Sequence, residues 1–220
     1  MTADSFSEGD MMGFYNNMIK YLAGFFCRLY RVEVIGAENI PADTEDTGAP
    51  AFMLCSNHIG NMDPVVIGAA IRIKIYWMAK DSLFRIPLLK QLISAFGAYP
   101  VSRGSGDVGA IKKTVEQLQH HRSVGIFPQG HRFPGIPPEQ TQIRHGAGMM
   151  LYRSGADALP VCIETKSRKL RPFCKTRVII GRRIPNEALG LSEGNAQTYR
   201  EATEKIFAQI CALSEAHRTW

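Results

Sequence analysis

The sequence lacks any apolar run of the roughly 18 residues that a clear transmembrane helix needs. Its first ten residues, MTADSFSEGD, are acidic where a signal peptide would be basic, and no small-residue cleavage site follows an apolar stretch. We therefore expect neither a membrane-spanning protein nor a cleaved secretory leader.

The sequence also lacks paired cysteines. Its five cysteines are an odd number, and no two of them have the CxxC spacing of zinc or redox sites. We interpret them as reduced thiols in a cytoplasmic environment and expect no metal site. The cysteines are Cys27, Cys55, Cys162, Cys174 and Cys211.

Acids are missing from the segment KSRKLRPFCKTRVIIGRR, residues 166–183, and the whole chain of 220 residues carries a net charge of +6. This balance favours anionic partners, such as a membrane surface with anionic lipids, phosphorylated substrates or an acidic carrier protein. No aromatic-interleaved nucleic-acid motif accompanies the basic residues, so we exclude nucleic acid as a partner.

Strands and helices alternate along the chain, which predicts an α/β fold. Segments such as residues 51–57 and 158–164 are nearly continuous apolar runs, as expected of strands buried on both faces. Residues 106–121 have helical spacing of apolar side chains. We predict a single domain over residues 32–220, with a mostly parallel mixed sheet covered by helices.

Before this domain, residues 1–31 form a separate unit, which we predict to be a tail and an amphipathic helix. Aromatic and aliphatic side chains recur there at helical spacing opposite a narrow basic stripe. This pattern is typical of a helix in a membrane interface, and a helix docked on the domain core would show it too. The apolar positions are Phe14, Met18, Tyr21, Leu22, Phe25 and Leu29.

The segment CSNHIGNMDPVV, residues 55–66, places His58 and Asp63 just after a predicted buried strand. Asp63 precedes a proline, so it could simply cap the next helix. Alternatively, the carboxylate could accept a hydrogen bond from one imidazole nitrogen and leave the other free to take a proton. A metal site using His131 as well would be a weak ligand set.

The sequence has no serine or cysteine nucleophile in a GxSxG elbow. A His–Asp pair without such a nucleophile suits direct transfer, in which the hydroxyl of the substrate itself attacks an activated acyl group. Sites of α/β sheets gather beyond the carboxyl ends of the strands, where the segments around His58, Arg103 and Arg132 are predicted to lie.

Four segments in order resemble the glycerolipid acyltransferase superfamily, which includes the 1-acyl-sn-glycerol-3-phosphate acyltransferases. NHIGNMD is similar to the NHxxxxD motif of that family, and KDSLFRIPLLKQLISAFGAYPVSRG to its second block. GIFPQGHRF is similar to the third block, usually FPEGTRS, and IRHGAGMMLYRSGADALPVCIE to the fourth. The order holds from about residue 30 to residue 184.

The resemblance implies a function and roles for seven residues. His58 would be the general base and Asp63 would orient it. The substrate-binding residues would be Asn57, Arg103, Gln129, Gly130 and Arg132. The reaction would transfer an acyl group from coenzyme A or acyl carrier protein to the sn-2 hydroxyl of 1-acyl-sn-glycerol 3-phosphate, forming phosphatidic acid without a cofactor.

The third block departs from the family pattern, because Gln129 stands where glutamate is usual and His131 where threonine is usual. Other acceptors therefore stay open: a different lysophospholipid, or an amino-acid lipid. A non-catalytic module that binds lipid headgroups is the rival of another class. The resemblance also implies a peripheral protein on the cytoplasmic face of the cell membrane.

Overall fold

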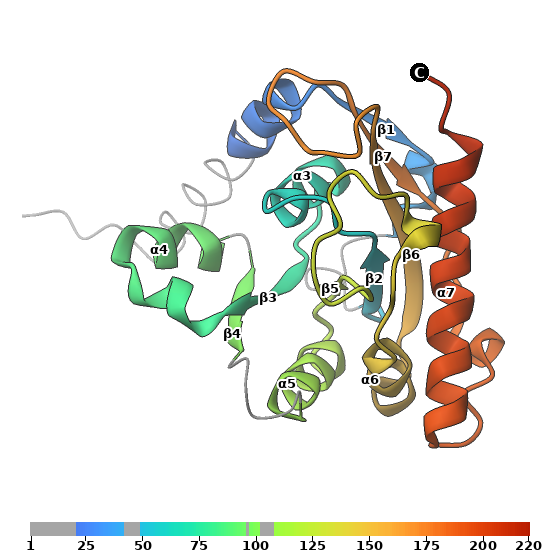
Figure 1. Cartoon of the computed structure of the whole chain (residues 1–220). Coiled ribbons are helices and arrows are strands. Elements are labelled where there is room, and N and C mark those ends of the chain that lie inside the picture. Colours follow the sequence, from blue (N-terminus) through green and yellow to red (C-terminus); the bar gives the residue numbers. More distant parts are fainter. Residues whose placement is uncertain (1–20, 42–48, 96, 102–107) are drawn as a thin grey trace, which may run out of the picture.

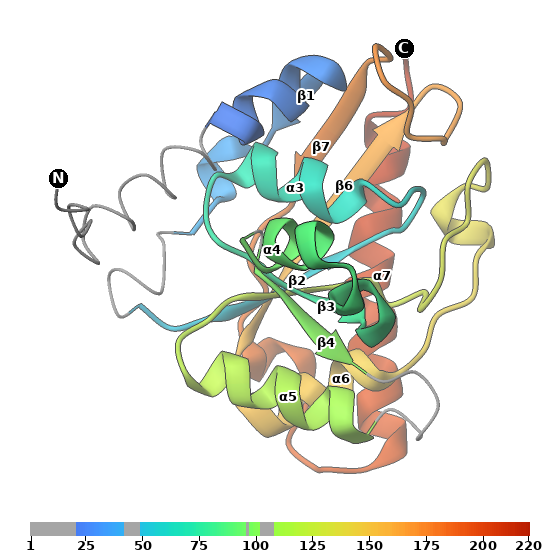
Figure 2. The same ribbon diagram turned by 90° about the vertical axis from the view of Figure 1, so that its left-hand side faces the viewer.

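Seven strands form one sheet in the computed structural model, which describes residues 21–41, 49–95, 97–101 and 108–220 (Figures 1 and 2). The order across the sheet is β1-β7-β6-β2-β5-β3-β4. The strands are β1 (Val32–Ile35), β2 (Phe52–Ser56), β3 (Tyr76–Lys80), β4 (Ala98–Val101), β5 (Val124–Ile126), β6 (Asp157–Thr165) and β7 (Thr176–Ile180).

The strand directions confirm the predicted mostly parallel mixed sheet. The neighbours β6-β2, β2-β5, β5-β3 and β3-β4 are parallel, and so are β1 and β7. Only β6 and β7 pair antiparallel within the described sheet. The carboxyl ends of β2, β3, β4, β5 and β6 therefore share one edge, where the sequence predicts the site.

Helices cover both faces of this sheet, as predicted (Figure 1). α5, α6 and α7 pack on one face, and α3 packs on the other. The helices are α3 (Asp63–Ile71), α4 (Pro87–Ala95), α5 (Val108–Gln119), α6 (Gly146–Ser154) and α7 (Ala196–Ala216). Short 3-10 turns are η1 (Ala37–Asn39), η2 (Asp81–Arg85), η3 (Pro138–Gln140) and η4 (Asn186–Leu189).

Strand β2 shows why the apolar runs form central strands. Phe52 and Leu54 enter the core beneath α3, while Met53 and Cys55 enter the core beneath α5, α6 and α7. Successive side chains of a strand point to opposite faces, so a strand covered on both faces must be apolar at every position. The position of β2 in the centre of the sheet fixes where the loop carrying His58 begins.

The described part of the N-terminal helix covers residues 21–29 and is docked on the domain, while the membrane-interface interpretation stays a prediction. Phe26 and Leu29 pack against the core beneath α3, while Tyr21 and Phe25 are 81% and 57% exposed. The helix is thus docked on the domain and also presents aromatic rings to its surroundings. The remainder of the predicted helix, with Phe14 and Met18, lies outside the described residues, so the boundary between residues 31 and 32 stays a prediction.

Candidate active site

The loops that follow β2, β5 and β6 meet beyond the carboxyl edge of the sheet. The main-chain N–H of Phe133, in the loop after β5, donates to the carbonyl of His58 at 2.8 Å. The N–H of Gly135 donates to the carbonyl of Arg168, in the loop after β6, at 2.8 Å. The loop after β5 is therefore bonded both to the predicted catalytic loop and to the loop after β6.

His58 and Asp63 form the predicted hydrogen-bonded pair. Nδ1 of His58 lies 2.7 Å from Oδ2 of Asp63, and the same oxygen accepts the main-chain N–H groups of Ile59 at 2.6 Å and Gly60 at 2.8 Å. The Asp63 side chain is fully buried, whereas that of His58 is 17% exposed. A carboxylate that accepts Nδ1–H leaves Nε2 as the free, basic nitrogen of the ring.

The capping interpretation of Asp63 is wrong. α3 begins at Asp63, with proline in its first turn, but the carboxylate caps none of the N–H groups of the helix. It turns back to the preceding loop instead. Its second oxygen, Oδ1, is buried and has no hydrogen-bond partner among the described residues.

The third interpretation was a metal site formed by His58, Asp63 and His131. His131 is exposed and its ring lies against Phe133, with the ring centroids 4.2 Å apart. Within the described ranges, no three histidine, cysteine or acidic side chains are grouped as metal ligands.

An aromatic stack, which the sequence did not suggest, supports the imidazole of His58. The Phe127 ring lies parallel to the imidazole, with centroids 3.9 Å apart and 9° between the planes. Trp77 stacks on Phe127 at 5.0 Å and 20°. Phe127 could have been found as the first residue of the FPQG segment, whereas Trp77 lies on β3, whose pairing with β5 only the structure shows.

Asn57 is not placed to contact a substrate as predicted. It is buried, its Nδ2 donates to the carbonyl of Ile163 at 2.9 Å, and its Oδ1 accepts the N–H of Ile163 at 2.8 Å. The side-chain amide of Asn57 thus makes the two hydrogen bonds to Ile163 that the main chain of a neighbouring strand would otherwise make. Asn57 continues the pairing of β2 and β6 by one residue and fixes the start of the catalytic loop.

Gln129 is also turned inward, which differs from the predicted substrate contact. It is 2% exposed. Its Oε1 accepts the main-chain N–H of His58 at 2.6 Å, and its Nε2 donates to Oγ1 of Thr141 at 2.7 Å. The amide therefore links the catalytic loop to the segment that carries Thr141.

Two of the other predicted substrate-binding residues, Gly130 and Arg132, are exposed. Arg132 donates to Oδ1 of Asn61, a residue of the catalytic loop. Gly130 has a φ of 72°, and a Cβ there would lie 2.9 Å from Nε of Arg144. Arg144 was missed as a site residue, although its position in the basic-x-Gly segment was visible. Arg103 lies outside the described residues.

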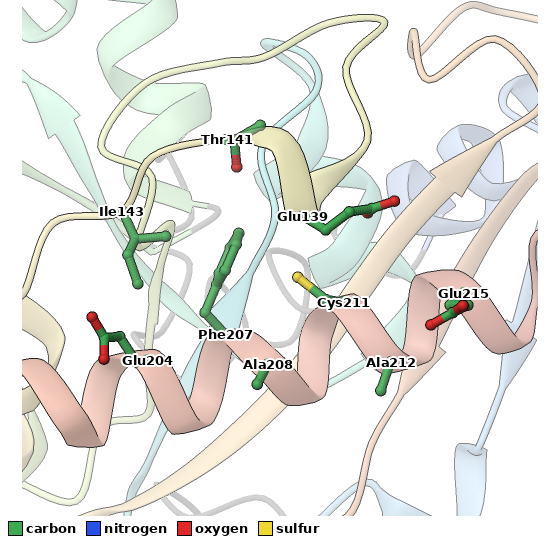
Figure 3. A pocket seen from close by; sticks show the side chains of 9 residues that line it. All are labelled: Glu139, Thr141, Ile143, Glu204, Phe207, Ala208, Cys211, Ala212 and Glu215. Carbon is green, nitrogen blue, oxygen red and sulfur yellow. The ribbon is translucent and has the colours of Figure 1, made fainter.

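A groove lies between the η3 segment and α7, and its lining includes Thr141, the partner of Gln129 (Figure 3). Its floor includes Phe207 and Cys211, and its edges carry Glu139, Glu204 and Glu215. None of the residues that line the groove is basic, so it does not suit the phosphate of the predicted acceptor.

Comparisons with known proteins agree with the resemblance. The 1-acyl-sn-glycerol-3-phosphate acyltransferase of Borreliella burgdorferi is 30% identical over 135 residues, which are 60% of this chain and 51% of that protein. The enzyme of the same name from Streptococcus pneumoniae is 24% identical over 97% of this chain and 77% of its own length. The crystal structure of the 1-acyl-sn-glycerophosphate acyltransferase of Thermotoga maritima superposes with a TM-score of 0.72 at 19% identity, covering 96% of this chain and 84% of that one.

The first of these relatives, and the Escherichia coli enzyme of the same name, are matched over about half of their length, 51% and 53%. The model of the Acyltransferase family matches residues 31–164, which contain the His58–Asp63 pair, the aromatic stack and Gln129. The chain belongs to the Acyltransferase family.

Proposed function

We propose that the protein is an O-acyltransferase that transfers an acyl group from a thioester to the sn-2 hydroxyl of 1-acyl-sn-glycerol 3-phosphate, forming phosphatidic acid for phospholipid synthesis. The observation that carries the proposal is the 2.7 Å contact between Nδ1 of His58 and Oδ2 of Asp63 at the strand ends. A module that only binds headgroups needs no such pair. The names of the relatives support the choice of acceptor.

In the proposed mechanism, Nε2 of His58 takes the proton of the acceptor hydroxyl while its oxygen attacks the thioester carbonyl. The tetrahedral intermediate then expels the thiolate, and the imidazolium returns the proton to that sulfur. Asp63 holds Nδ1–H and stabilises the positive charge of the imidazolium between these steps. The proposed donor is acyl-coenzyme A or acyl carrier protein, and the reaction needs no cofactor, because both proton transfers use the same imidazole.

We propose that guanidinium groups hold the phosphate of the acceptor. Arg132 donates a hydrogen bond to Asn61 in the catalytic loop, and the side chain of Arg144 lies against Gly130. A guanidinium binds phosphate through paired N–H donors better than an ammonium does. A fixed phosphate would bring the nearby hydroxyl to His58. Arg103 stays a predicted member of this site.

The acceptor is tested by comparing 1-acylglycerol 3-phosphate, lysophosphatidylcholine and a phosphate-free 1-acylglycerol in detergent. We expect the first to have the highest kcat/KM, and Arg132→Ala to raise its KM about tenfold or more, the size of one lost charge-assisted contact. Arg200→Ala, which removes an Arg of α7 paired with Glu204, is the matched control. Equal use of the phosphate-free acceptor would contradict the proposal.

We also propose that the protein lies peripherally on a membrane, with helix 21–29 and α4 toward the lipid. Both lie on the side that faces the viewer in Figure 2. Tyr21 and Phe25 are exposed on the first helix, as are Leu88 and Leu92 on α4. Exposed apolar side chains of this density mark a contact surface. Among the described helices, none is long and apolar enough to cross a bilayer.

The loop between β6 and β7 adds positive charge beside this surface. The N–H of Phe173 donates to the carbonyl of Leu29 at 2.6 Å, so the loop adjoins the end of helix 21–29. Phe173 itself is 74% exposed, and Lys169 and Arg171 in the same loop are exposed. Basic side chains are attracted to the anionic lipids of the cytoplasmic leaflet. We therefore propose the cytoplasmic face of the cell membrane as the location.

Sedimentation with vesicles tests this placement. We expect more binding to vesicles with 30% phosphatidylserine than to pure phosphatidylcholine, since about 1 kcal/mol per basic residue is gained near an anionic surface. The double variant Phe25→Ser/Leu88→Ser should bind several-fold more weakly. Val108→Ser, which removes an exposed apolar side chain from α5 on the opposite face of the sheet from α3, is the control. Equal binding by both variants and the unaltered protein would contradict this surface.

A further inference from the structure

The third sequence block surrounds His58 on several sides. Oε1 of Gln129 accepts the N–H of His58 at 2.6 Å, and the N–H of Phe133 donates to the carbonyl of His58 at 2.8 Å. The Phe127 ring covers one face of the imidazole at 3.9 Å. Among the contacts of His58 within the described residues, the one at Nδ1 comes from Asp63, the first residue of α3. The segment 127–133 therefore contacts both the main chain and the imidazole ring of His58.

Gln129 can hold His58 because its own amide is fixed at the other end. Nε2 of Gln129 donates to Oγ1 of Thr141, and this hydroxyl donates to the carbonyl of Pro138 at 2.7 Å. A hydroxyl has a single proton, so Thr141 must accept from the amide nitrogen while it donates to Pro138. This direction leaves Oε1 of Gln129 aimed at the N–H of His58.

The direction of this chain explains why glutamine suits the position. A glutamate could still accept the N–H of His58, but it could not donate to Thr141. The threonine hydroxyl would then have to turn toward the carboxylate and leave the carbonyl of Pro138. Glutamine keeps all three hydrogen bonds at once and adds no negative charge beside the site proposed for a phosphate.

The stack fixes the plane of the ring in a similar way. Trp77 is buried and lies over Gly125, where a Cβ would meet its ring at 2.5 Å. Trp77 in turn supports Phe127 at 5.0 Å. With Phe127 on one face and Asp63 at Nδ1, the imidazole of His58 cannot rotate about its χ2 bond without losing both contacts. The edge that carries Nε2 is the edge left for the substrate.

We propose that Phe127 and Gln129 are positioning residues for His58, and that Thr141 extends this clamp to the segment after η3. The proposal rests on the proposed function, in which His58 is the base. It assigns to Gln129 a role in placing the base in place of a contact with the acceptor. Displacement of a catalytic group by about 1 Å costs on the order of 100-fold in rate.

Steady-state kinetics of two variants that remove single contacts test the clamp. Thr141→Val removes the hydroxyl and keeps the shape, and Phe127→Leu removes the stack. We expect each to lower kcat about 10- to 100-fold, with KM within about threefold. Thr141→Ser and Phe127→Tyr restore the hydroxyl and the ring and should recover most of kcat. Gln142→Leu, an exposed neighbour of Thr141, is the matched control and should change neither constant.

Two outcomes would overturn the clamp. A KM that rises in Thr141→Val and Gln129→Glu while kcat is unchanged would place this amide at the acceptor. Unchanged kcat and KM in Thr141→Val and Phe127→Leu would show that the contacts do not position the base.

A readout without acyl transfer separates this proposal from the proposed function. In protein labelled with ¹⁵N in its histidine rings, we expect His58 to give one sharp Nδ1–H signal that broadens in Thr141→Val and in Phe127→Leu and sharpens again in Thr141→Ser. An unchanged signal in both variants would contradict the clamp whether or not the protein is active. If the unaltered folded protein transfers no acyl group but the signal behaves as expected, the proposed function fails and the positioning of His58 stands.

Discussion

Replacing Asp63 with asparagine separates the charge of the dyad from its geometry. Oδ2 of Asp63 faces the N–H groups of Ile59 and Gly60 as well as His58. The carbonyl oxygen of an asparagine must take this place, because the flipped amide would set its own N–H₂ group against two main-chain donors. His58 therefore keeps its proton on Nδ1 in the variant, and Nε2 stays free. What the variant loses is the negative charge.

The magnitude of that loss follows from the contact. With 2.7 Å between Nδ1 and Oδ2, the centres of the two charged groups lie roughly 4 Å apart, and a full charge pair at an effective dielectric of about 20 is worth about 4 kcal/mol. If half of the proton is transferred in the transition state, about 2 kcal/mol is lost, or roughly 30-fold in kcat. Complete transfer sets an upper limit of about 1000-fold. KM should stay within about threefold, because the carboxylate is fully buried.

The assay is acyl transfer by Asp63→Asn in detergent, with the melting temperature measured in parallel. Glu116→Gln makes the same chemical change on α5, away from the site, and serves as the matched control. Unchanged kcat in folded Asp63→Asn would refute the argument that this charge stabilises the imidazolium. An increase in KM with unchanged kcat would place the carboxylate in substrate binding instead.

Two further predictions concern packing and thiol chemistry. A Cβ on residue 148 would lie 2.1 Å from the carbonyl oxygen of Tyr199. Gly148→Ala should therefore lower the melting temperature by about 4–8 °C, because overpacking costs about 2 kcal/mol net of helix propensity. Gly146→Ala, where the nearest atom to the new Cβ is 3.8 Å away, is the control and should not lower the melting temperature. Burial, followed by the charge of Glu139, raises the pKa of Cys211 to about 11, so its thiolate is scarce at pH 8 and alkylation should accelerate about tenfold per pH unit up to pH 11. Mass spectrometry after brief alkylation at pH 8 should find the exposed Cys174 modified first, and equal labelling of Cys211 would contradict its burial.

The sequence was sufficient for the fold class and for the location of the site. Apolar runs such as residues 51–57 are expected of strands buried on both faces, so their type followed from composition, whereas the order of the strands across the sheet did not. The carboxyl ends of parallel strands share an edge, which located His58 and the loop of Gln129 together. The contact between His58 and Asp63 was one of three options that the sequence left open, beside a helix cap and a metal site, and the structure shows the contact.

The orientation of buried amides could not be predicted in this way. Asn57 and Gln129 belong to the sequence motifs that predict the site. Each side-chain amide, however, hydrogen-bonds a main-chain group that only the folded chain brings near: that of Ile163 for Asn57 and that of His58 for Gln129. A pattern gives the position of a polar residue and not its partner. The stack of Phe127 on the imidazole was missed for the same reason, because it joins two loops 69 residues apart along the chain.

The central claim is that His58 is the base of an acyl transfer, and one measurement tests it most directly. Purified protein in detergent is given 1-acylglycerol 3-phosphate with acyl-coenzyme A and, in parallel, with acyl carrier protein thioester, beside His58→Ala. We predict phosphatidic acid with at least one donor and a loss of roughly 1000-fold or more in the variant, the order expected when general-base catalysis is removed. Full activity in folded His58→Ala, or no product from the folded unaltered protein with either donor, would contradict the account.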